Sequence, residues 1–288
     1  MNKIPSPRID DAMALQAVSN NSKLGSYPDL QGVRAVIQQG YLQYVAARGN
    51  AHAVMPVLLS QQIGAHLESH YKSPPADLKH ITDLRAETEH LACPMCGSSH
   101  RGTLDHLLPK GNYPAFAVFS LNLVPACKCN SKRKELLKGP NPGERILHPY
   151  FDDCLAERLI AAKFEKLGAI PDVGLQLCVD STHPDYAAID FHVRSIVQRT
   201  SIVNFLRDRW IEFCRKPSLI VRALKRNPQS AQALKLTLED ELALLDDLYR
   251  GKNTWYSIFV AGLLHPEVLL WIFSQMHSPG RAADGPLI

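Results

Sequence analysis

The sequence predicts a mainly α-helical protein of the α+β class, in which helical arms surround a small core near the middle of the chain. Apolar residues recur at helical spacing over most of residues 1–90 and 151–288. Residues 91–150 differ, because they are rich in glycine, proline and cysteine and favour short elements. The chain has 288 residues, of which 45% are apolar and 21% charged, so it can bury a sizeable core. We therefore divide it into these three regions.

Residues 1–90 form the predicted N-terminal helical region. Its expected elements are a polar arm over residues 1–25 with a short helix around Asp10–Val18, two helices within Pro28–His70 that separate at Gly49-Asn50, a loop over Lys72–Asp77, and a helix over His80–Leu91. The last of these helices would lead directly into the cysteine-rich middle region.

Residues 91–150 are expected to fold as a hairpin followed by a helix. The brief strand candidates are Leu104 and Val118-Phe119, the helix covers Asn130–Leu137, and Gly139-Pro140-Asn141-Pro142-Gly143 ends it.

Residues 151–288 form the predicted C-terminal helical region, with one or two short strands. Strict alternation over Asp172–Asp180 indicates a half-buried strand. The expected helical segments are Ala156–Leu167, Ile189–Cys214, Ser218–Lys225, Leu234–Tyr249, and Thr254–Phe273 with an interruption at His265-Pro266.

Overall charge and apolar content exclude several classes of protein. A net charge of +4 and a pI near 8.6 are only mildly basic, so global charge barely favours a nucleic-acid partner. No apolar run approaches the ~20 residues of a membrane span, and the first residues lack a charged-then-apolar signal pattern. We expect a cytoplasmic protein without a membrane anchor.

Four of the seven cysteines lie in the middle region and have the order of a metal site. Cys93 and Cys96 have the two-residue spacing of a zinc knuckle, and Cys127 and Cys129 would supply the other half of a closed, structural site. One residue rather than two separates the second pair. One ligand could therefore come from elsewhere, with His100 as the nearest substitute, or the two pairs could simply pack. Cys154, Cys178 and Cys214 stand alone and are expected to be buried thiols.

A four-cysteine site leaves no open position for water, so catalysis would need a second metal. Asp105 offers carboxylate oxygens suited to Mg²⁺ or Mn²⁺, and Asn130 offers an amide oxygen from the first turn of the predicted helix. His106 follows Asp105 on an extended segment and would point to the opposite face, free to act as a general base. The alternatives are a surface turn at Asp105-His106 and a helix cap at Asn130.

These residues resemble the HNH endonucleases, a family with a ββα-metal fold, in the variant whose last histidine is an asparagine. The resemblance rests on Leu104-Asp105-His106-x-x-Pro109-Lys110, Asn122-Leu123-Val124-Pro125 and Cys129-Asn130-x-x-x-Lys134. It implies that His106 deprotonates the attacking water, that Asp105 and Asn130 hold one divalent cation, and that Asn122 holds the motif loop and orients His106. The implied products carry a 5′ phosphate and a 3′ hydroxyl.

A basic run surrounds this motif and predicts contact with the phosphate backbone of DNA. Its members are Lys110, Lys128, Lys132, Arg133, Lys134 and Lys138. A solvated surface is the alternative reading. Such contacts would position a duplex without specifying its sequence.

Flanking segments are similar to the nuclease subunits of Septu-type anti-phage systems, which work beside a partner ATPase. The segments are Tyr113-Pro114-Ala115-Phe116, His148-Pro149-Tyr150-Phe151-Asp152 and Asn253-Thr254-Trp255. The resemblance implies a role in defence against foreign DNA. The helical arms could bind the ATPase, form an oligomer or grip DNA, and their leucine-rich faces favour partner binding. The competing hypothesis is a zinc-ribbon nucleic-acid-binding or scaffold protein with an inactive catalytic centre.

Overall fold

The computed structural model describes residues 1–86, 92–99 and 102–288, and it is mostly helical with two small antiparallel sheets, as the sequence predicts. The helices are α1 (Asp11–Asn20), α2 (Asp29–Ala46), α3 (Gln61–Lys72), α4 (Lys79–Ala86), α5 (Cys129–Lys132), α6 (Tyr186–His192), α7 (Ile202–Arg215), α8 (Ala231–Leu248), α9 (Trp255–Leu263) and α10 (Pro266–Met276). The strands are β1 (Thr103–His106), β2 (Leu123–Ala126), β3 (Ile160–Glu165) and β4 (Asp172–Leu177).

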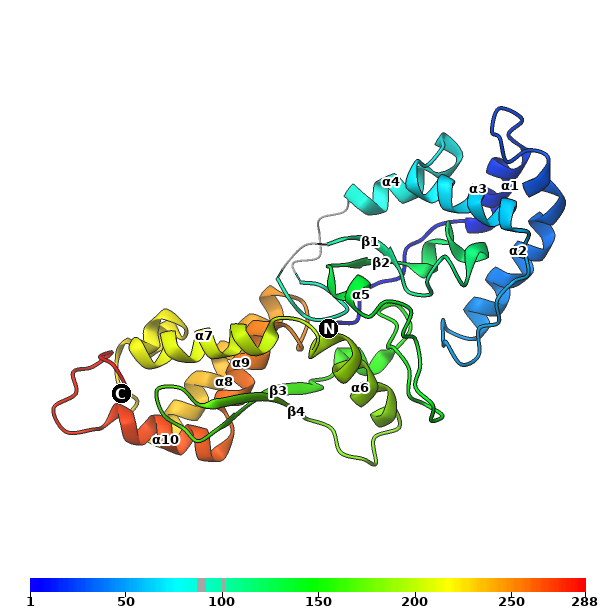
Figure 1. The fold of residues 1–288 in the computed structure, drawn as a ribbon. Coiled ribbons are helices and arrows are strands. Elements are labelled where there is room, and N and C mark those ends of the chain that lie inside the picture. Colours follow the sequence, from blue (N-terminus) through cyan, green and yellow to red (C-terminus); the bar gives the residue numbers. More distant parts are fainter. Residues whose placement is uncertain (87–91, 100–101) are drawn as a thin grey trace.

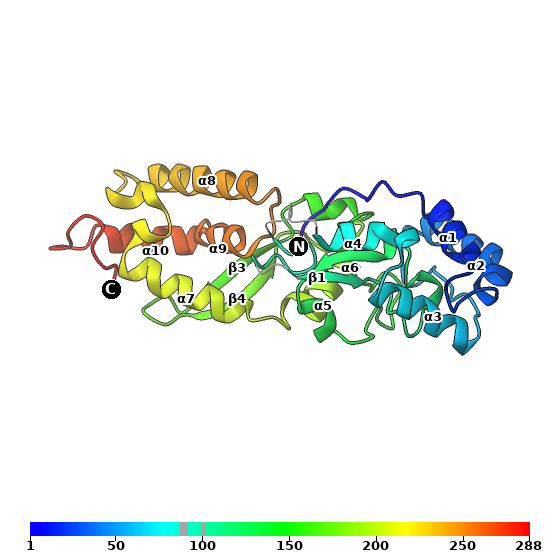
Figure 2. The ribbon, with the colours of Figure 1, turned by 90° about the horizontal axis from the view of Figure 1, so that it is seen from above.

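The molecule is elongated, with the hairpin of β1 and β2 between two helical regions (Figure 1). Helices α1 to α4 gather at one end and α7 to α10 at the other, and the view from above shows the same order (Figure 2). We call β1, β2 and α5 together the motif hairpin. Helix α4 packs against β1 and residues 193–197 pack against α5, so the motif hairpin contacts both helical regions.

Capping side chains and a glycine turn set the ends of the N-terminal helices. Asp10 caps α1 by accepting a hydrogen bond from the Met13 backbone N–H at 2.9 Å, and Ser60 does the same for α3. Between α2 and α3 the chain turns through the left-handed region at Gly49, whose φ is +66°. A side chain there would also collide with His148. The predicted helices before His70 and the break at Gly49-Asn50 are thus confirmed. Helix α4 confirms the next prediction as far as Ala86, and residues 87–91 lie outside the described part of the chain.

Two large apolar cores support the two ends. The N-terminal core encloses an aromatic group in which the Tyr41 and Phe119 rings stack at 4.1 Å and Tyr44 meets Phe116 at 5.2 Å. The C-terminal core forms around Trp210 and Phe259, with α9 covering β3. The motif hairpin adds apolar side chains to the first core, which anchors one of its faces.

Three expected elements of the sequence were wrong. Val118-Phe119 is not a strand, because Val118 lies in a turn after a 3-10 helix, and β1 pairs instead with β2. Both side chains are buried in the N-terminal core. The expected helix over Asn130–Leu137 ends at Lys132, because Lys134 adopts a left-handed φ of +55°. The expected helix over Ala156–Leu167 is largely β3, whose Ala162 pairs with Leu175 of β4.

The rest of the C-terminal region follows the expected pattern except at Ser218–Lys225, which forms two short 3-10 helices, Pro217–Leu219 and Arg222–Lys225. Strand β4 lies within the alternating segment, and α8 covers the leucine-rich one. Helices α9 and α10 separate at His265, and Pro266 takes the first position of α10, where its missing N–H costs nothing. The long segment from Ile189 is divided, because a turn at Thr200 separates a π-helical stretch from α7.

In the part of the chain that the structure describes, no single helix is long and apolar enough to be a membrane span. The bent pair α9 and α10, which meet at 75°, reaches the required length and composition together.

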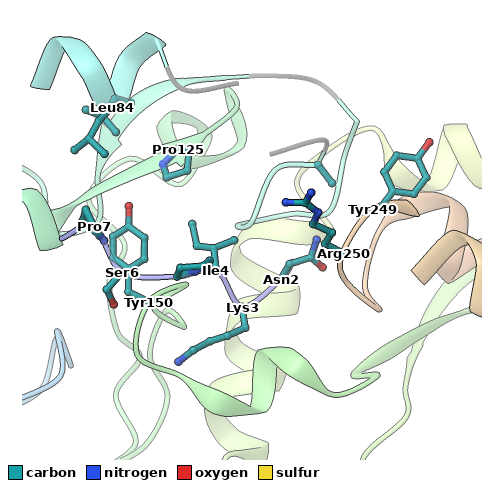
Figure 3. Close-up of a pocket in the computed structure, with 13 residues that line it drawn as sticks. Asn2, Lys3, Ile4, Ser6, Pro7, Leu84, Pro125, Tyr150, Tyr249 and Arg250 are labelled. Atoms are coloured by element: carbon teal, nitrogen blue, oxygen red, sulfur yellow. The ribbon is translucent and has the colours of Figure 1, made fainter. Parts of the chain in front are cut away.

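Residues 2–7 run as an extended arm past the hairpin (Figure 3). The arm lines a cavity of about 400 Å³ together with Pro125, Tyr150 and Arg250. Lys3 anchors the arm through an ion pair of 2.8 Å with Asp153. None of the predicted catalytic residues lines this cavity.

Candidate active site and cysteine cluster

The antiparallel register of the motif hairpin brings the predicted catalytic residues together. Asp105 pairs with Val124 and His106 with Leu123, and α5 then returns the chain across β1. The Asn130 amide nitrogen donates to Asp105 Oδ2 at 2.8 Å and to the His106 carbonyl oxygen at 3.0 Å. A short helix is therefore fixed directly against the strand that carries the acid and the histidine.

Asp105 is the most accessible of these groups, with a side chain 34% exposed. Its Oδ1 accepts a hydrogen bond from the His106 backbone N–H at 2.8 Å. It lines a cleft of about 270 Å³, which we call the Asp105 cleft, whose cationic lining includes Lys110 and Lys134. Each carboxylate oxygen keeps a lone pair beyond its one hydrogen bond, and carboxylate oxygens are the ligands that Mg²⁺ and Mn²⁺ prefer.

The His106 side chain is almost fully buried, at 3% exposure. Its Nε2 lies 2.9 Å from the Ala117 carbonyl oxygen, which can only accept, so Nε2 carries the proton. Nδ1 then holds the lone pair, 3.9 Å from Asp105 Oδ1. Burial lowers the pKa of His106 to about 4. The ring is therefore neutral at neutral pH and has the protonation state of a general base.

Asn122 is fully buried and holds the loop that follows β1. Its Oδ1 accepts from the Leu108 N–H at 2.8 Å and from the Tyr44 hydroxyl at 3.1 Å. Its Nδ2 donates to the carbonyl oxygens of Leu108 and Phe116. Phe116, whose carbonyl oxygen accepts from Asn122, directly precedes Ala117, whose carbonyl oxygen contacts His106 Nε2. Asn122 thus orients the histidine through the backbone, without direct contact.

The Asn130 amide oxygen points away from the Asp105 carboxylate. It accepts a hydrogen bond of 2.7 Å from Arg133 Nε, and because guanidinium groups only donate, this contact fixes the amide orientation. In this arrangement the amide oxygen is occupied by Arg133, and the role of Asn130 as a metal ligand stays a prediction. Asn130 positions Asp105 with its amide N–H groups.

Arg133 corrects an expectation, because it does not lie on the surface. Its side chain is among the largest fully buried ones, and its guanidinium also donates to the carbonyl oxygens of His106, Leu107 and Leu136. Burial lowers its pKa to about 10, so it stays charged at neutral pH. Its N–H groups are used in these interior contacts, although the residue also borders the Asp105 cleft. Its place three residues after Asn130 is the sequence signal that could have indicated an inward contact.

Replacing this buried arginine gives a first testable prediction. Arg133→Met should lower the free energy of unfolding by about 2–3 kcal/mol, because three backbone carbonyls lose a charged donor inside the protein. Urea denaturation would measure it. Arg226→Met, at an exposed arginine, is the matched control and should change stability by less than ~0.5 kcal/mol. Equal losses in both variants would contradict the interior role.

The remaining lysines of the basic run stay accessible. Lys128, Lys132, Lys134 and Lys138 are exposed, and Lys110 is half-buried with its ammonium 5.9 Å from the Tyr71 ring. That ring also contacts His106 at 4.2 Å between centroids. Tyr71 belongs to α3, far from the motif in sequence, and no sequence pattern marked it.

The four cysteines converge despite the irregular second pair. All four sulfurs of Cys93, Cys96, Cys127 and Cys129, which we call the cysteine cluster, lie within 4.8 Å of one another. The Sγ atoms of Cys93 and Cys129 are 3.7 Å apart, and those of Cys96 and Cys127 are 3.5 Å apart. A tetrahedral zinc with Zn–S bonds of about 2.3 Å needs sulfurs about 3.8 Å apart. The cluster could therefore hold a metal ion such as zinc. His100 lies outside the described residues.

The first cysteine pair is also tied to distant parts of the chain through its backbone. The carbonyl oxygen of Met95 contacts His192 Nε2 at 2.7 Å, and that of Cys96 accepts from the Trp255 indole N–H at 2.9 Å. The Trp255 backbone N–H donates to the Gly97 carbonyl. The cysteine cluster consequently connects the motif hairpin to α6 and α9.

His148 is buried beside the motif hairpin, and its burial gives a second testable prediction. It is fully buried, its Nε2 lies 3.1 Å from both the Tyr44 hydroxyl and the Leu121 carbonyl, and burial lowers its pKa to about 3. The unfolded chain, with an ordinary histidine pKa near 6.5, binds the proton first as pH falls. Stability is therefore lost between pH 6.5 and about 3, by about 1.5 kcal/mol between pH 6.5 and 5.

Urea midpoints at pH 6.5 and pH 5 would measure this effect. His148→Gln should remove that share of the pH dependence, whereas His52→Gln, at an exposed histidine, should retain it. A His148→Gln protein with the wild-type difference between the two pH values would contradict the assignment.

Comparison with known proteins gives one partial match. The chain is 39% identical over 62 residues to protein ea31 of Escherichia phage lambda, a stretch that covers 21% of each protein. The chain thus spans about a fifth of the length of that relative. No protein-family model matches the chain. No solved structure matches it either.

Proposed function

We propose that this protein is a metal-dependent endonuclease of the HNH type that hydrolyses phosphodiester bonds of DNA. The observation that carries the proposal is the pairing of a neutral His106, whose Nδ1 holds a lone pair, with the accessible Asp105 carboxylate 3.9 Å away. A general base beside an oxygen ligand for a divalent cation is the combination that phosphodiester hydrolysis requires.

In this proposal, His106 Nδ1 takes the proton of the attacking water, and the Ala117 carbonyl holds the opposite ring nitrogen in place. Asp105 would hold Mg²⁺ or Mn²⁺, which supplies stabilisation of the negative charge on the phosphate and the leaving 3′ oxygen. Asn130 keeps Asp105 oriented, with Arg133 behind it. Lys110 and Lys134 line the same cleft and would attract the phosphate backbone.

Removing the metal ligand tests this function. Purified protein should cleave plasmid DNA with Mg²⁺ or Mn²⁺ and lose cleavage in EDTA. Asp105→Asn should raise the metal concentration needed for half-maximal cleavage at least about tenfold, because a neutral amide binds these cations more weakly than a carboxylate. Manganese binding, followed by electron paramagnetic resonance, gives a readout that does not depend on turnover. Metal-independent cleavage, or unchanged manganese affinity in the variant, would contradict the proposal.

We further propose that the cysteine cluster holds a structural zinc, since four thiolates leave no open position for a reacting water. Defence against foreign DNA beside a partner ATPase is the setting that the flanking motifs favour. Exposed leucines on α8 support partner binding, namely Leu236, Leu244 and Leu248. Size measurement of the protein alone and mixed with the product of its neighbouring gene tests this association. A monomer that stays unchanged in the mixture would count against it.

A further inference from the structure

A second hollow adjoins the Asp105 cleft and shares one wall with it. This pocket, which we call the Tyr71 pocket, has a volume of about 590 Å³, within the range of small-ligand sites. Asp105 lines both hollows. A strand of nucleic acid with its scissile phosphate at Asp105 would therefore extend from one hollow into the other.

The walls of the Tyr71 pocket come from segments far apart in the sequence. Thr103 of β1, Lys132 of α5, and Thr200 and Ser201, which precede α7, all line it. Tyr71 of α3 contributes an aromatic ring, over which the Arg85 guanidinium lies 4.6 Å from the centroid, and Trp255 of α9 also lines the pocket. The C-terminal region thus completes a cavity that begins at the motif hairpin.

The chemistry of the lining suits one nucleotide. Lys128 and Lys132 are both exposed and supply two positive charges, and Asp105, Cys127 and Cys129 also line the pocket. Hydroxyl groups of threonine and serine can contact phosphate and sugar oxygens, and an aromatic side chain can stack on any base without reading its identity. Charge, hydroxyls and an aromatic ring together match the three parts of a nucleotide.

We propose that the Tyr71 pocket receives the nucleotide next to the scissile phosphate, taken out of the stack of the cleaved strand. The inference rests on the proposed nuclease function and adds to it a substrate class, DNA with an unpaired nucleotide beside the cleavage position. Extracting a nucleotide from a paired duplex costs a few kcal/mol, and least where it is already unpaired. Duplexes with an unpaired nucleotide should therefore bind more tightly than fully paired ones.

Fluorescence anisotropy with labelled duplexes in Ca²⁺ tests the pocket by binding rather than by cleavage. One duplex is fully paired, and the other carries a single unpaired nucleotide in the same sequence. Wild-type protein should bind the second on the order of tenfold to hundredfold more tightly. Ser201→Trp should reduce this preference to less than about threefold, because the large side chain fills the pocket from the α7 wall.

Thr103→Tyr is a second blocking variant at another lining residue, and Ser274→Trp is the matched control at an exposed serine of α10, outside the pocket. Thermal melting and zinc content should be unchanged in the variants that are compared. Equal affinity of wild type for both duplexes, or an undiminished preference in both blocking variants, would overturn the pocket assignment. If the protein cleaves DNA but shows no such preference, the nuclease proposal is retained and only the pocket assignment is wrong. If the blocking variants lose the preference for the unpaired nucleotide but the wild-type protein cleaves no DNA, the pocket assignment is supported and the nuclease proposal is wrong.

Discussion

His106→Gln is expected to lower the rate of DNA cleavage by about 10²–10⁴-fold, the usual contribution of a well-placed general base. The glutamine amide can still donate a hydrogen bond to the Ala117 carbonyl, which His106 Nε2 contacts at 2.9 Å. The variant therefore removes the Nδ1 lone pair while keeping a donor for the buried acceptor. Single-turnover cleavage of a labelled duplex at saturating Mg²⁺ would measure the loss in the chemical step.

The control for this variant is His52→Gln, because His52 is exposed and lies in the turn after α2, away from the Asp105 cleft. Both variants should melt at the wild-type temperature within a few degrees and bind Mn²⁺ with wild-type affinity. Cleavage by His106→Gln within threefold of wild type would rule out His106 as the base. That result would favour the competing hypothesis of a nucleic-acid-binding protein with an inactive catalytic centre.

The elements that sequence predicted well are those whose pattern is decided locally. Strand β4 shows strict alternation, and α8 shows a regular leucine stripe. Strand β3 has no such signal, because Ile160, Ala161 and Ala162 are buried one after another and a short continuous apolar run fits a helix as well as a strand. Its conformation depends on pairing with β4 and on cover from α9, which are tertiary effects.

In the candidate site too, the sequence predicted the placement of some residues and not of others. The motif predicted that Asp105 and Asn130 meet at one hairpin, and the structure joins their side chains by a hydrogen bond of 2.8 Å. The Asn122 side chain instead holds the loop after β1. The inward turn of Arg133 was not predictable from charge, since lysine and arginine runs look alike whichever member is buried. It depends on contacts in the folded chain, where the guanidinium donates to Asn130 Oδ1 and to backbone carbonyl oxygens. The Tyr71 pocket could not be predicted at all, because its walls meet only in the folded chain.

Removal of the metal from the cysteine cluster should have the largest effect on stability. Structural zinc contributes roughly 10–16 kcal/mol of apparent binding free energy in small zinc modules, which exceeds the stability of many whole domains. Cys96→Ser leaves three thiolates, and we expect the purified variant to contain less than half of the wild-type zinc. Wild-type protein should contain one zinc per chain if the cluster binds as proposed. Elemental analysis after gel filtration would measure both values.

Loss of zinc should also loosen the contact between the motif hairpin and the C-terminal region, because the Cys96 carbonyl oxygen accepts from the Trp255 indole N–H at 2.9 Å. We therefore expect a change in tryptophan fluorescence and faster amide exchange in α9 before the C-terminal core unfolds. Cys178→Ser is the matched control, since Cys178, against the expectation of a buried thiol, is exposed and lies outside the cluster. A Cys96→Ser protein that keeps its zinc and its exchange protection would show that the four sulfurs only pack together. Asp105 and His106 would then be positioned by the hydrogen bonds of Asn122, Asn130 and Arg133, without a contribution from bound zinc.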